Sequence, residues 1–137
     1  MRTIRMAGLL FLCATSACTP GGPALVSVSG TITLDGQPLA GATVRFVPLD
    51  DTAGHGGTGR TDPQGIYEVV ANRQNERKGL LPGKYRVAIS TLAPGAKPIE
   101  TNERESVPDP YHSIRESPLE AVVDVSPKTF DFALKKK

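Results

Sequence analysis

Two histidines are the side chains of this chain best suited to acid–base or metal chemistry. His55 lies in a glycine-rich stretch, and His112 lies in a proline-rich stretch four residues before Glu116. Neither histidine has a second histidine or a cysteine at the spacing of a zinc site, so no metal centre is expected. A site that combines His112 with Arg104, Glu116 or Tyr111 stays open as the basis of a small hydrolase or ligand-binding protein. No serine stands in the Gly-x-Ser-x-Gly pattern of a nucleophile elbow, which counts against the hydrolase.

Glycines and aspartates suggest two further kinds of site, and loops explain both better. The glycines within residues 54–59 spell Gly-x-Gly-x-x-Gly, but a turn follows them instead of the helix that a nucleotide phosphate needs. We therefore expect residues 50–59 to form a mobile loop between strands, and we expect no cofactor. Asp50, Asp51 and Asp62 could collect at one end of the fold and bind Ca²⁺, which takes six to eight oxygens. Solvated loop carboxylates are the favoured interpretation.

The first eighteen residues follow the order of a secretory signal, which is basic, then apolar, then small. Arg2 and Arg5 precede an apolar run over residues 6–13, and residues 15–18 read Thr-Ser-Ala-Cys. A membrane-spanning helix needs about 20 apolar residues, and this run is too short. The closing Cys18 makes the segment resemble the lipobox of bacterial lipoproteins.

That resemblance implies where the protein resides. Residues 1–17 are expected to be removed as a signal peptide, and Cys18 to become the lipid-bearing (palmitate-containing) first residue of an exported protein of the cell envelope. Residues 18–24 form a tether, and Thr19, where an aspartate would signal retention, favours the outer membrane. The partner so implied is a membrane, reached through the lipid anchor. Ordinary secretion with cleavage near Ala17 is the alternative.

Charge after removal of the leader excludes one class of partner. The loss of Arg2 and Arg5 lowers the 16 basic residues to 14, which equals the 14 acidic residues. A neutral chain without a basic stripe is not expected to bind nucleic acid. The lysines at 135–137 could touch an anionic surface, although a frayed, solubilising terminus is more common. Acylation of Cys18 would leave no free thiol, so the fold must be stable without disulfides.

The rest of the chain predicts a single all-β domain over residues 25–137. Removal of 17 of the 137 residues leaves 120, enough for one domain. Apolar and polar residues alternate with period two in short segments separated by Asp-Gly and Pro-Gly turns, which is typical of a β-sandwich. The expected strands lie at 25–34, 42–47, 66–70, 84–90, 119–125 and 130–134, with a short seventh around Arg60. Residues 91–118 are expected to form a long irregular crossing.

We therefore predict a seven-stranded, Greek-key-like β-sandwich with no substantial helix. The predicted core consists of Val28, Ile32, Val44, Phe46, Tyr67, Val69, Tyr85, Val87, Ile89, Leu119, Val123, Phe130 and Phe132. Val125 is expected to share the inward face of its strand with Leu119 and Val123. Gly30 interrupts the apolar face of the first strand and predicts a bulge or a close backbone contact.

Several turn and strand motifs resemble those of carboxypeptidase-regulatory-like domains. They are residues 28–44 (VSGTITLDGQPLAGATV), 61–67 (TDPQGIY) and 81–87 (LPGKYRV). Segments 107–111, 117–119 and 130–132 resemble the tail of small bacterial lipoproteins built on this domain. The resemblance covers residues 26–135 and implies the transthyretin-like or prealbumin-like sandwich. Every matched residue is a turn former or a core residue.

The resemblance implies architecture more than activity. The zinc-bearing catalytic domain of the carboxypeptidases is missing, and the chain ends in Leu-Lys-Lys-Lys instead of the Tyr-Arg-Gly-Ser of transthyretin-like enzymes that open hydroxyisourate. We expect a non-catalytic, membrane-tethered module whose loops contact an envelope protein or polysaccharide. The alternative is the hydrolase or ligand-binding protein that uses the His112 loop.

Overall fold

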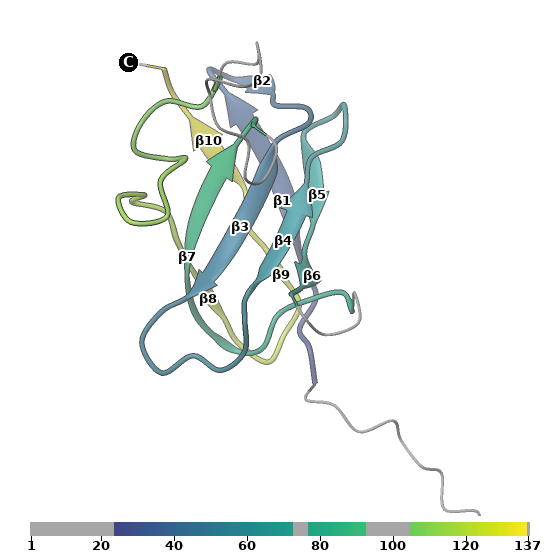
Figure 1. The fold of residues 1–137 in the computed structure, drawn as a ribbon. Coiled ribbons are helices and arrows are strands. Elements are labelled where there is room, and N and C mark those ends of the chain that lie inside the picture. Colours follow the sequence, from purple (N-terminus) through teal and green to yellow (C-terminus); the bar gives the residue numbers. More distant parts are fainter. Residues whose placement is uncertain (1–23, 73–76, 93–104, 137) are drawn as a thin grey trace, which may run out of the picture.

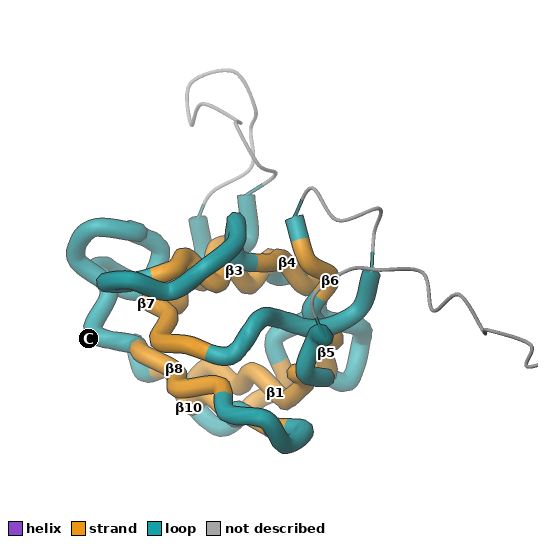
Figure 2. The backbone as a smooth tube through the Cα atoms, turned by 90° about the horizontal axis from the view of Figure 1, so that it is seen from below, coloured by secondary structure: helices purple, strands orange, loops and turns teal. Residues whose placement is uncertain are grey.

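The computed structural model describes residues 24–72, 77–92 and 105–136, and these residues form two β-sheets and no helix. Figure 1 shows the chain entering at one end of the sandwich and leaving at the other, and Figure 2 shows the two layers. The strands are β1 (Val28–Leu34), β2 (Gln37–Pro38), β3 (Thr43–Pro48), β4 (Gly57–Arg60), β5 (Ile66–Glu68), β6 (Val70–Ala71), β7 (Gly83–Ser90), β8 (Glu120–Val123), β9 (Lys128–Thr129) and β10 (Phe132–Leu134). A helix able to cross a membrane is likewise absent from these ranges.

β1 is the centre of the first sheet because four short strands pair with it. β2 and β5 run antiparallel to β1, whereas β9 and β10 run parallel to it. The turn from β1 to β2 consists of Asp35 and Gly36, whose φ angles of 51° and 80° fit the tight hairpin that their sequence predicts. The parallel pairs make this a mixed sheet, which brings the end of the chain back onto its first strand.

The second sheet has the order β6-β4-β3-β7-β8, with all pairs antiparallel. β3 and β7 lie at its centre and pair along six residues, from Thr43 opposite Ser90 to Pro48 opposite Tyr85. The predicted register of β7 is confirmed, since Val87 has no exposed surface and Arg86 is only half-buried. A slip of one residue would have reversed these two side chains.

Residues 66–71 join the two sheets at one side of the sandwich. β5 pairs with β1 in the first sheet, and β6 pairs with β4 in the second. Val69 lies between them with no exposed surface, and its N–H donates to the Val28 carbonyl at 2.9 Å. The chain therefore changes sheets at one fully buried residue.

Most of the predicted core is confirmed. Leu119, Phe130 and Phe132 are only half-buried against the core, while the other ten predicted residues are buried. The prediction omitted Leu80 and Val107, which lie outside regular strands and are 1% and 2% exposed. Their burial comes from the tertiary fold, which a period-two pattern does not report.

Two sequence predictions are corrected. β8 ends at Val123, and Val125 is 87% exposed instead of facing inward. The stretch over 50–59 is not wholly a loop, because Gly57 and Gly59 belong to β4. A Cβ atom on Gly57 would lie 2.6 Å from the Val69 side chain, so glycine is needed where the sheets approach closely. The seventh strand expected around Arg60 is β4.

The described part of the chain has ten strands and not seven, because the predicted strand at 66–70 is divided into β5 and β6, and the two-residue strands β2 and β9 lie outside the predicted strands. β9 and β10 keep one register along β1, with Ser29 opposite Thr129 and Ile32 opposite Phe132. Between these pairs the Phe130 carbonyl accepts a hydrogen bond from the Tyr67 hydroxyl at 2.6 Å, and the Thr31 N–H donates to the Asp131 carboxylate at 2.9 Å. The Phe130 N–H still donates to the Ser29 carbonyl at 2.9 Å, so side-chain groups replace the backbone partners only of the Phe130 carbonyl and the Thr31 N–H.

Gly30 lies at this interruption and makes the close contact that its sequence position predicts. A Cβ atom there would lie 1.9 Å from the Phe130 carbonyl oxygen and 2.9 Å from the Tyr67 hydroxyl oxygen. Any side chain at position 30 would therefore displace both hydrogen-bonding partners. We call Gly30, Tyr67 and Phe130 the Gly30 node.

Candidate functional site

Residues 105–119, which we call the crossing segment, hold most of the side chains that the sequence suggests for chemistry. β8 pairs only with the first half of β7, so the edge of β7 beyond Arg86 needs other partners. The crossing segment supplies them: the Val87 N–H donates to the Leu119 carbonyl and the Ile89 N–H to the Tyr111 carbonyl, each at 2.9 Å. The segment is irregular, as predicted, yet it protects a strand edge as a further strand would.

Buried side chains fix the crossing segment on the sandwich. Val107 belongs to the core, and Tyr111 packs against the core while half-buried. Ser117 is 4% exposed, and its hydroxyl donates to the Val87 carbonyl at 2.5 Å. Tyr111 thus holds this loop on the sandwich.

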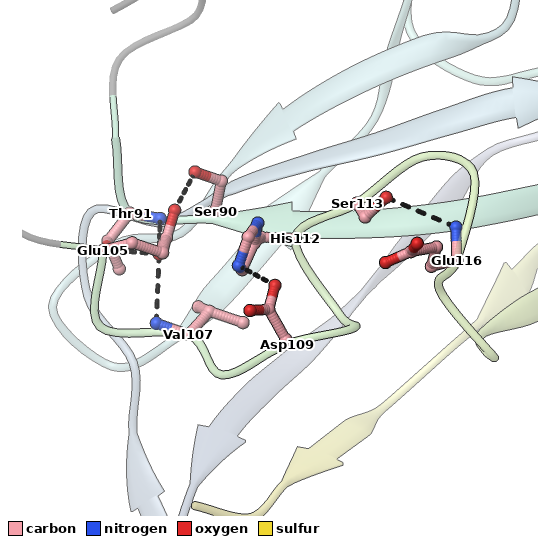
Figure 3. A network of polar contacts seen from close by, with 8 residues as sticks. All are labelled: Ser90, Thr91, Glu105, Val107, Asp109, His112, Ser113 and Glu116. Atoms are coloured by element: carbon pink, nitrogen blue, oxygen red, sulfur yellow. Dashed lines mark hydrogen bonds and ion pairs between the residues drawn. The ribbon is translucent and has the colours of Figure 1, made fainter. Parts of the chain in front are cut away.

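Glu105 is the most highly connected polar side chain of the segment (Figure 3). One carboxylate oxygen accepts hydrogen bonds from the Thr91 N–H at 2.9 Å, the Thr91 hydroxyl at 2.8 Å and the Val107 N–H at 3.0 Å. The other oxygen accepts a hydrogen bond from the Ser90 hydroxyl. This Glu105 cluster ties the end of β7 to the start of the crossing segment, and it was not predicted from the sequence.

The electrostatics of Glu105 favour its charged form. Partial burial alone would raise its pKa, but the hydrogen bonds from Ser90, Thr91 and Val107 together outweigh burial and hold the pKa below the usual value. A carboxylate with these partners is ionised at neutral pH and acts as a structural acceptor. It is poorly suited to give or take a proton in a reaction.

His112 lies on the same segment and contacts one carboxylate. Its Nε2 atom is 2.5 Å from Oδ1 of Asp109, three residues earlier. The Asp109 side chain is 78% exposed and that of His112 is 33% exposed, so solvent reaches the pair. A catalytic triad needs a nucleophile at the ring nitrogen opposite to the one that contacts the acid. The neighbouring serine, Ser113, contacts backbone groups instead, and its hydroxyl accepts from the Glu116 N–H at 3.3 Å.

The structure does not assemble the predicted His112 constellation in the part that it describes. Glu116 is exposed and lies beyond Ser113 from His112 (Figure 3). Tyr111 packs against the core, and Arg104 lies outside the described residues. The acid near His112 is Asp109, which the sequence interpretation did not select.

The remaining candidate sites are separated by the topology. His55 lies in the loop from β3 to β4, whereas His112 follows Tyr111, whose carbonyl accepts from the Ile89 N–H near the C-terminal end of β7. Asp50 and Asp51 share the His55 loop, but Asp62 follows β4 and lies at its opposite end, so the three aspartates do not collect at one end as the calcium interpretation required. The Asp62 carboxylate instead accepts the N–H groups of Gln64 and Ile66 at 2.9 Å. Across residues 24–72, 77–92 and 105–136 no group of three potential metal ligands occurs.

The glycines of the nucleotide-like motif have structural partners. A Cβ atom on Gly56 would lie 2.0 Å from the Phe46 carbonyl oxygen, and one on Gly59 would lie 2.8 Å from the Glu68 carbonyl oxygen. These glycines therefore allow backbones to approach each other. No helix follows them, in agreement with the sequence interpretation.

Cys18 and the leader lie outside the described residues, so their predicted roles stay predictions. No family model, no curated protein and no solved structure matches this chain.

Proposed function

We propose that this protein is a non-catalytic lipoprotein of the bacterial cell envelope, anchored to a membrane through Cys18. The observation that carries the proposal is the sequence leading to Cys18, together with the short distance from Cys18 to the fold. Val26 is already in the core, only eight residues beyond Cys18. A seven-residue tether over 18–24 spans at most roughly 25 Å, which would keep the sandwich close to the membrane surface.

A structural or interaction role is supported by what the polar side chains do. Glu105, Ser117 and Asp62 all use their oxygens to hold backbone groups in place. With these polar side chains engaged in the fold, we propose that the exposed loops contact an envelope protein or polysaccharide. The neutral mature chain gives no reason to propose nucleic acid as a partner. The outer membrane is the proposed location, on the basis of Thr19.

The proposal includes a seven-stranded topology for the β-sandwich. Counting β5 with β6 and β9 with β10 as interrupted strands, and setting aside the two-residue β2, leaves seven strands. This count and the turn motifs support a Greek-key, transthyretin-like sandwich of the carboxypeptidase-regulatory type.

The anchor is tested by labelling a bacterial host that expresses the full chain with radioactive palmitate. We compare the parent with Cys18→Ser and with the matched control Cys13→Ser, which changes the leader only. The parent and Cys13→Ser are expected to carry label and to sediment with membranes, and Cys18→Ser is expected to carry none. Label and sedimentation of Cys18→Ser equal to the parent would overturn the proposal, and an unlabelled, released parent would establish ordinary secretion.

The competing hydrolase rests on the single contact between His112 and Asp109. It is tested with the purified parent and His112→Ala on a panel of activated esters. The proposal expects no turnover by either protein. Turnover by the parent that His112→Ala abolishes, at unchanged stability, would favour the hydrolase.

A further inference from the structure

One end of the sandwich carries an apolar groove next to the point where the chain enters. Residues 24–27, Pro82, Val125 and Pro127 line it, and its volume is about 380 Å³. Val125 is 87% exposed, more than any other large hydrophobic residue of the described ranges. We call this surface the tether-end groove; the end of the sandwich that carries it is the lower end in Figure 1, where the coloured ribbon begins.

The exposure of Val125 is fixed by its turn. The Asp124 carboxylate accepts the Ser126 N–H at 2.9 Å and lies 2.8 Å from the Lys128 amine. These two contacts lie within residues 124–128, and the apolar side chain of Val125 is directed outward. An exposed valine held beside two prolines and Leu25 forms a preshaped apolar surface, and such surfaces mark interaction sites.

The groove lies close in sequence to the proposed lipid anchor. Ala24 lines the groove, and Cys18 precedes Ala24 by six residues, which span at most roughly 22 Å. A lipid on Cys18 therefore holds its bilayer within that distance of the groove. Such tethering gives the bilayer an effective concentration that no free partner has.

The far end of the sandwich cannot make the same contact. Leu34, where β1 ends, is seven residues from Ser27, or roughly 23 Å along a strand. The Lys136 N–H donates to the Asp35 carboxylate at that far end, so Lys136 lies away from the groove. At the groove itself the acidic Asp124 is paired with the basic Lys128, so contact there would depend on apolar burial and not on lipid charge.

We propose that the tether-end groove rests on the bilayer interface, with Leu25, Pro82, Val125 and Pro127 at the boundary between headgroups and acyl chains. The domain then stands with its strands pointing away from the membrane and presents the Asp35 turn outward. This inference rests on the proposed anchor at Cys18 and adds an orientation to it.

The test uses the mature product of the full chain in phosphatidylcholine vesicles. Single cysteines replace Val125 at the groove, Val122 on the side of the second sheet and Gln37 at the far end; all three parent residues are exposed. Each variant carries an environment-sensitive fluorophore and is read with a nitroxide on the lipid acyl chains and with aqueous iodide. The parent without an added cysteine is the control and should take up no fluorophore, because an acylated Cys18 has no thiol.

The probe at Val125→Cys is expected to lose most of its fluorescence to the lipid nitroxide, the probe at Val122→Cys to lose less, and the probe at Gln37→Cys to lose none. Vesicles with added anionic lipid should give the same order. Equal iodide quenching at all three positions would overturn the inference and leave the anchor standing. Shielding of Val125→Cys from iodide without lipid quenching would assign the groove to a second copy. Release of the protein from membranes, together with reaction of the fluorophore with a free Cys18 thiol, would overturn the anchor and the inference with it.

Discussion

At the Gly30 node and at the Glu105 cluster, side chains make hydrogen bonds that backbone groups make elsewhere in a sheet. At the node, a neutral Tyr67 hydroxyl that is almost fully buried donates to one carbonyl. At the cluster, a half-buried carboxylate accepts from four donors. The node links β1 and β5 to the residue between β9 and β10 in the middle of a sheet, whereas the cluster attaches an irregular segment to the end of β7.

The hydrogen bonds of the two regions should therefore be lost at opposite extremes of pH. Burial, with a further contribution from the charge of Asp131, raises the pKa of the Tyr67 phenol. The hydrogen bonds of Glu105 outweigh its partial burial and lower the pKa of its carboxyl. Loss of the node's hydrogen bond is expected in alkali and should affect the whole sandwich, and loss of the cluster is expected in acid and should affect mainly the crossing segment. Side-chain hydrogen bonds that replace backbone pairing therefore stabilise the whole sandwich where they are buried and a single segment where they are only half-buried.

The largest expected effect comes from Gly30→Ala. Its Cβ atom would lie 1.9 Å from the Phe130 carbonyl oxygen, a backbone atom that cannot rotate away. Overpacking of this kind costs about 3 kcal/mol, a large part of the free energy of unfolding of a small domain. Urea denaturation measures it. Gly36→Ala is the control, because nothing lies within 4 Å of its Cβ position and only its φ of +80° is unfavourable. Equal costs for the two variants would contradict the close contact.

The next effect is that of Tyr67→Phe, which leaves the Phe130 carbonyl without its partner. We expect a cost of about 2 kcal/mol at neutral pH. Because the folded-state pKa of Tyr67 is raised, its contribution is complete below the ordinary value of 10.0 and is lost as the pH rises above it. The free energy of unfolding of the parent should therefore fall in alkali more steeply than that of Tyr67→Phe.

Tyr85→Phe is the matched control for this substitution. Its hydroxyl donates at 2.7 Å to Leu81, only four residues away, and burial raises its pKa as well. It should cost less than Tyr67→Phe because it does not join separate strands. A larger cost for Tyr85→Phe would show that the node is not the more important of the two.

A smaller and more local effect is expected for Glu105→Gln. One carboxylate oxygen becomes an amide nitrogen, which cannot accept, and we expect a cost of about 1 kcal/mol. Because the folded-state pKa of Glu105 is lowered, its contribution is present above the ordinary value of 4.5 and is lost as the pH falls through the folded value. The protection of the Thr91 and Val107 amides against hydrogen exchange, relative to the intrinsic rate at each pH, should be lower in the variant at neutral pH and should fall in the parent only in acid.

Glu116→Gln is the control, since Glu116 is an exposed carboxylate on the same crossing segment. It should leave the exchange at both amides unchanged. Exchange that accelerates equally in the strands of the first sheet would show that the Glu105 cluster is as global as the node.

The contrast between the regions also explains what could be predicted from the sequence. The alternation in β1 and β7, and the Asp35-Gly36 turn, are local properties, and their strands, register and buried faces follow from them. The exception is Val125, because alternation does not show where β8 ends. β4 was only partly predicted, since Gly57 and Gly59 have no side chains to show an alternation.

The candidate sites depend on contacts that are distant in the sequence or irregular. Glu105 meets Ser90 and Thr91 across fourteen or fifteen residues, and no spacing rule reports such a contact. The offset of 100 residues between β1 and the last strands is equally invisible, although Gly30 signalled that some backbone lies close to it. His112 was recognised for its chemistry, but its partner Asp109 was not.

The smallest effect is expected for His112→Ala, because its contact with Asp109 joins two solvent-accessible side chains of the crossing segment and does not attach the segment to a strand. The pair with Asp109 is open to solvent, and exposed ion pairs contribute about 0 to 1 kcal/mol. We expect the free energy of unfolding to change by less than about 0.5 kcal/mol, with exchange at Thr91 and Val107 unaltered. Ser117→Ala on the same segment is the control: it removes a buried donor to the Val87 carbonyl and should cost about 1 to 2 kcal/mol. A loss for His112→Ala as large as that for Ser117→Ala would mean that the histidine is part of the attachment of the crossing segment, and that exposure is a poor guide to which polar contacts matter there.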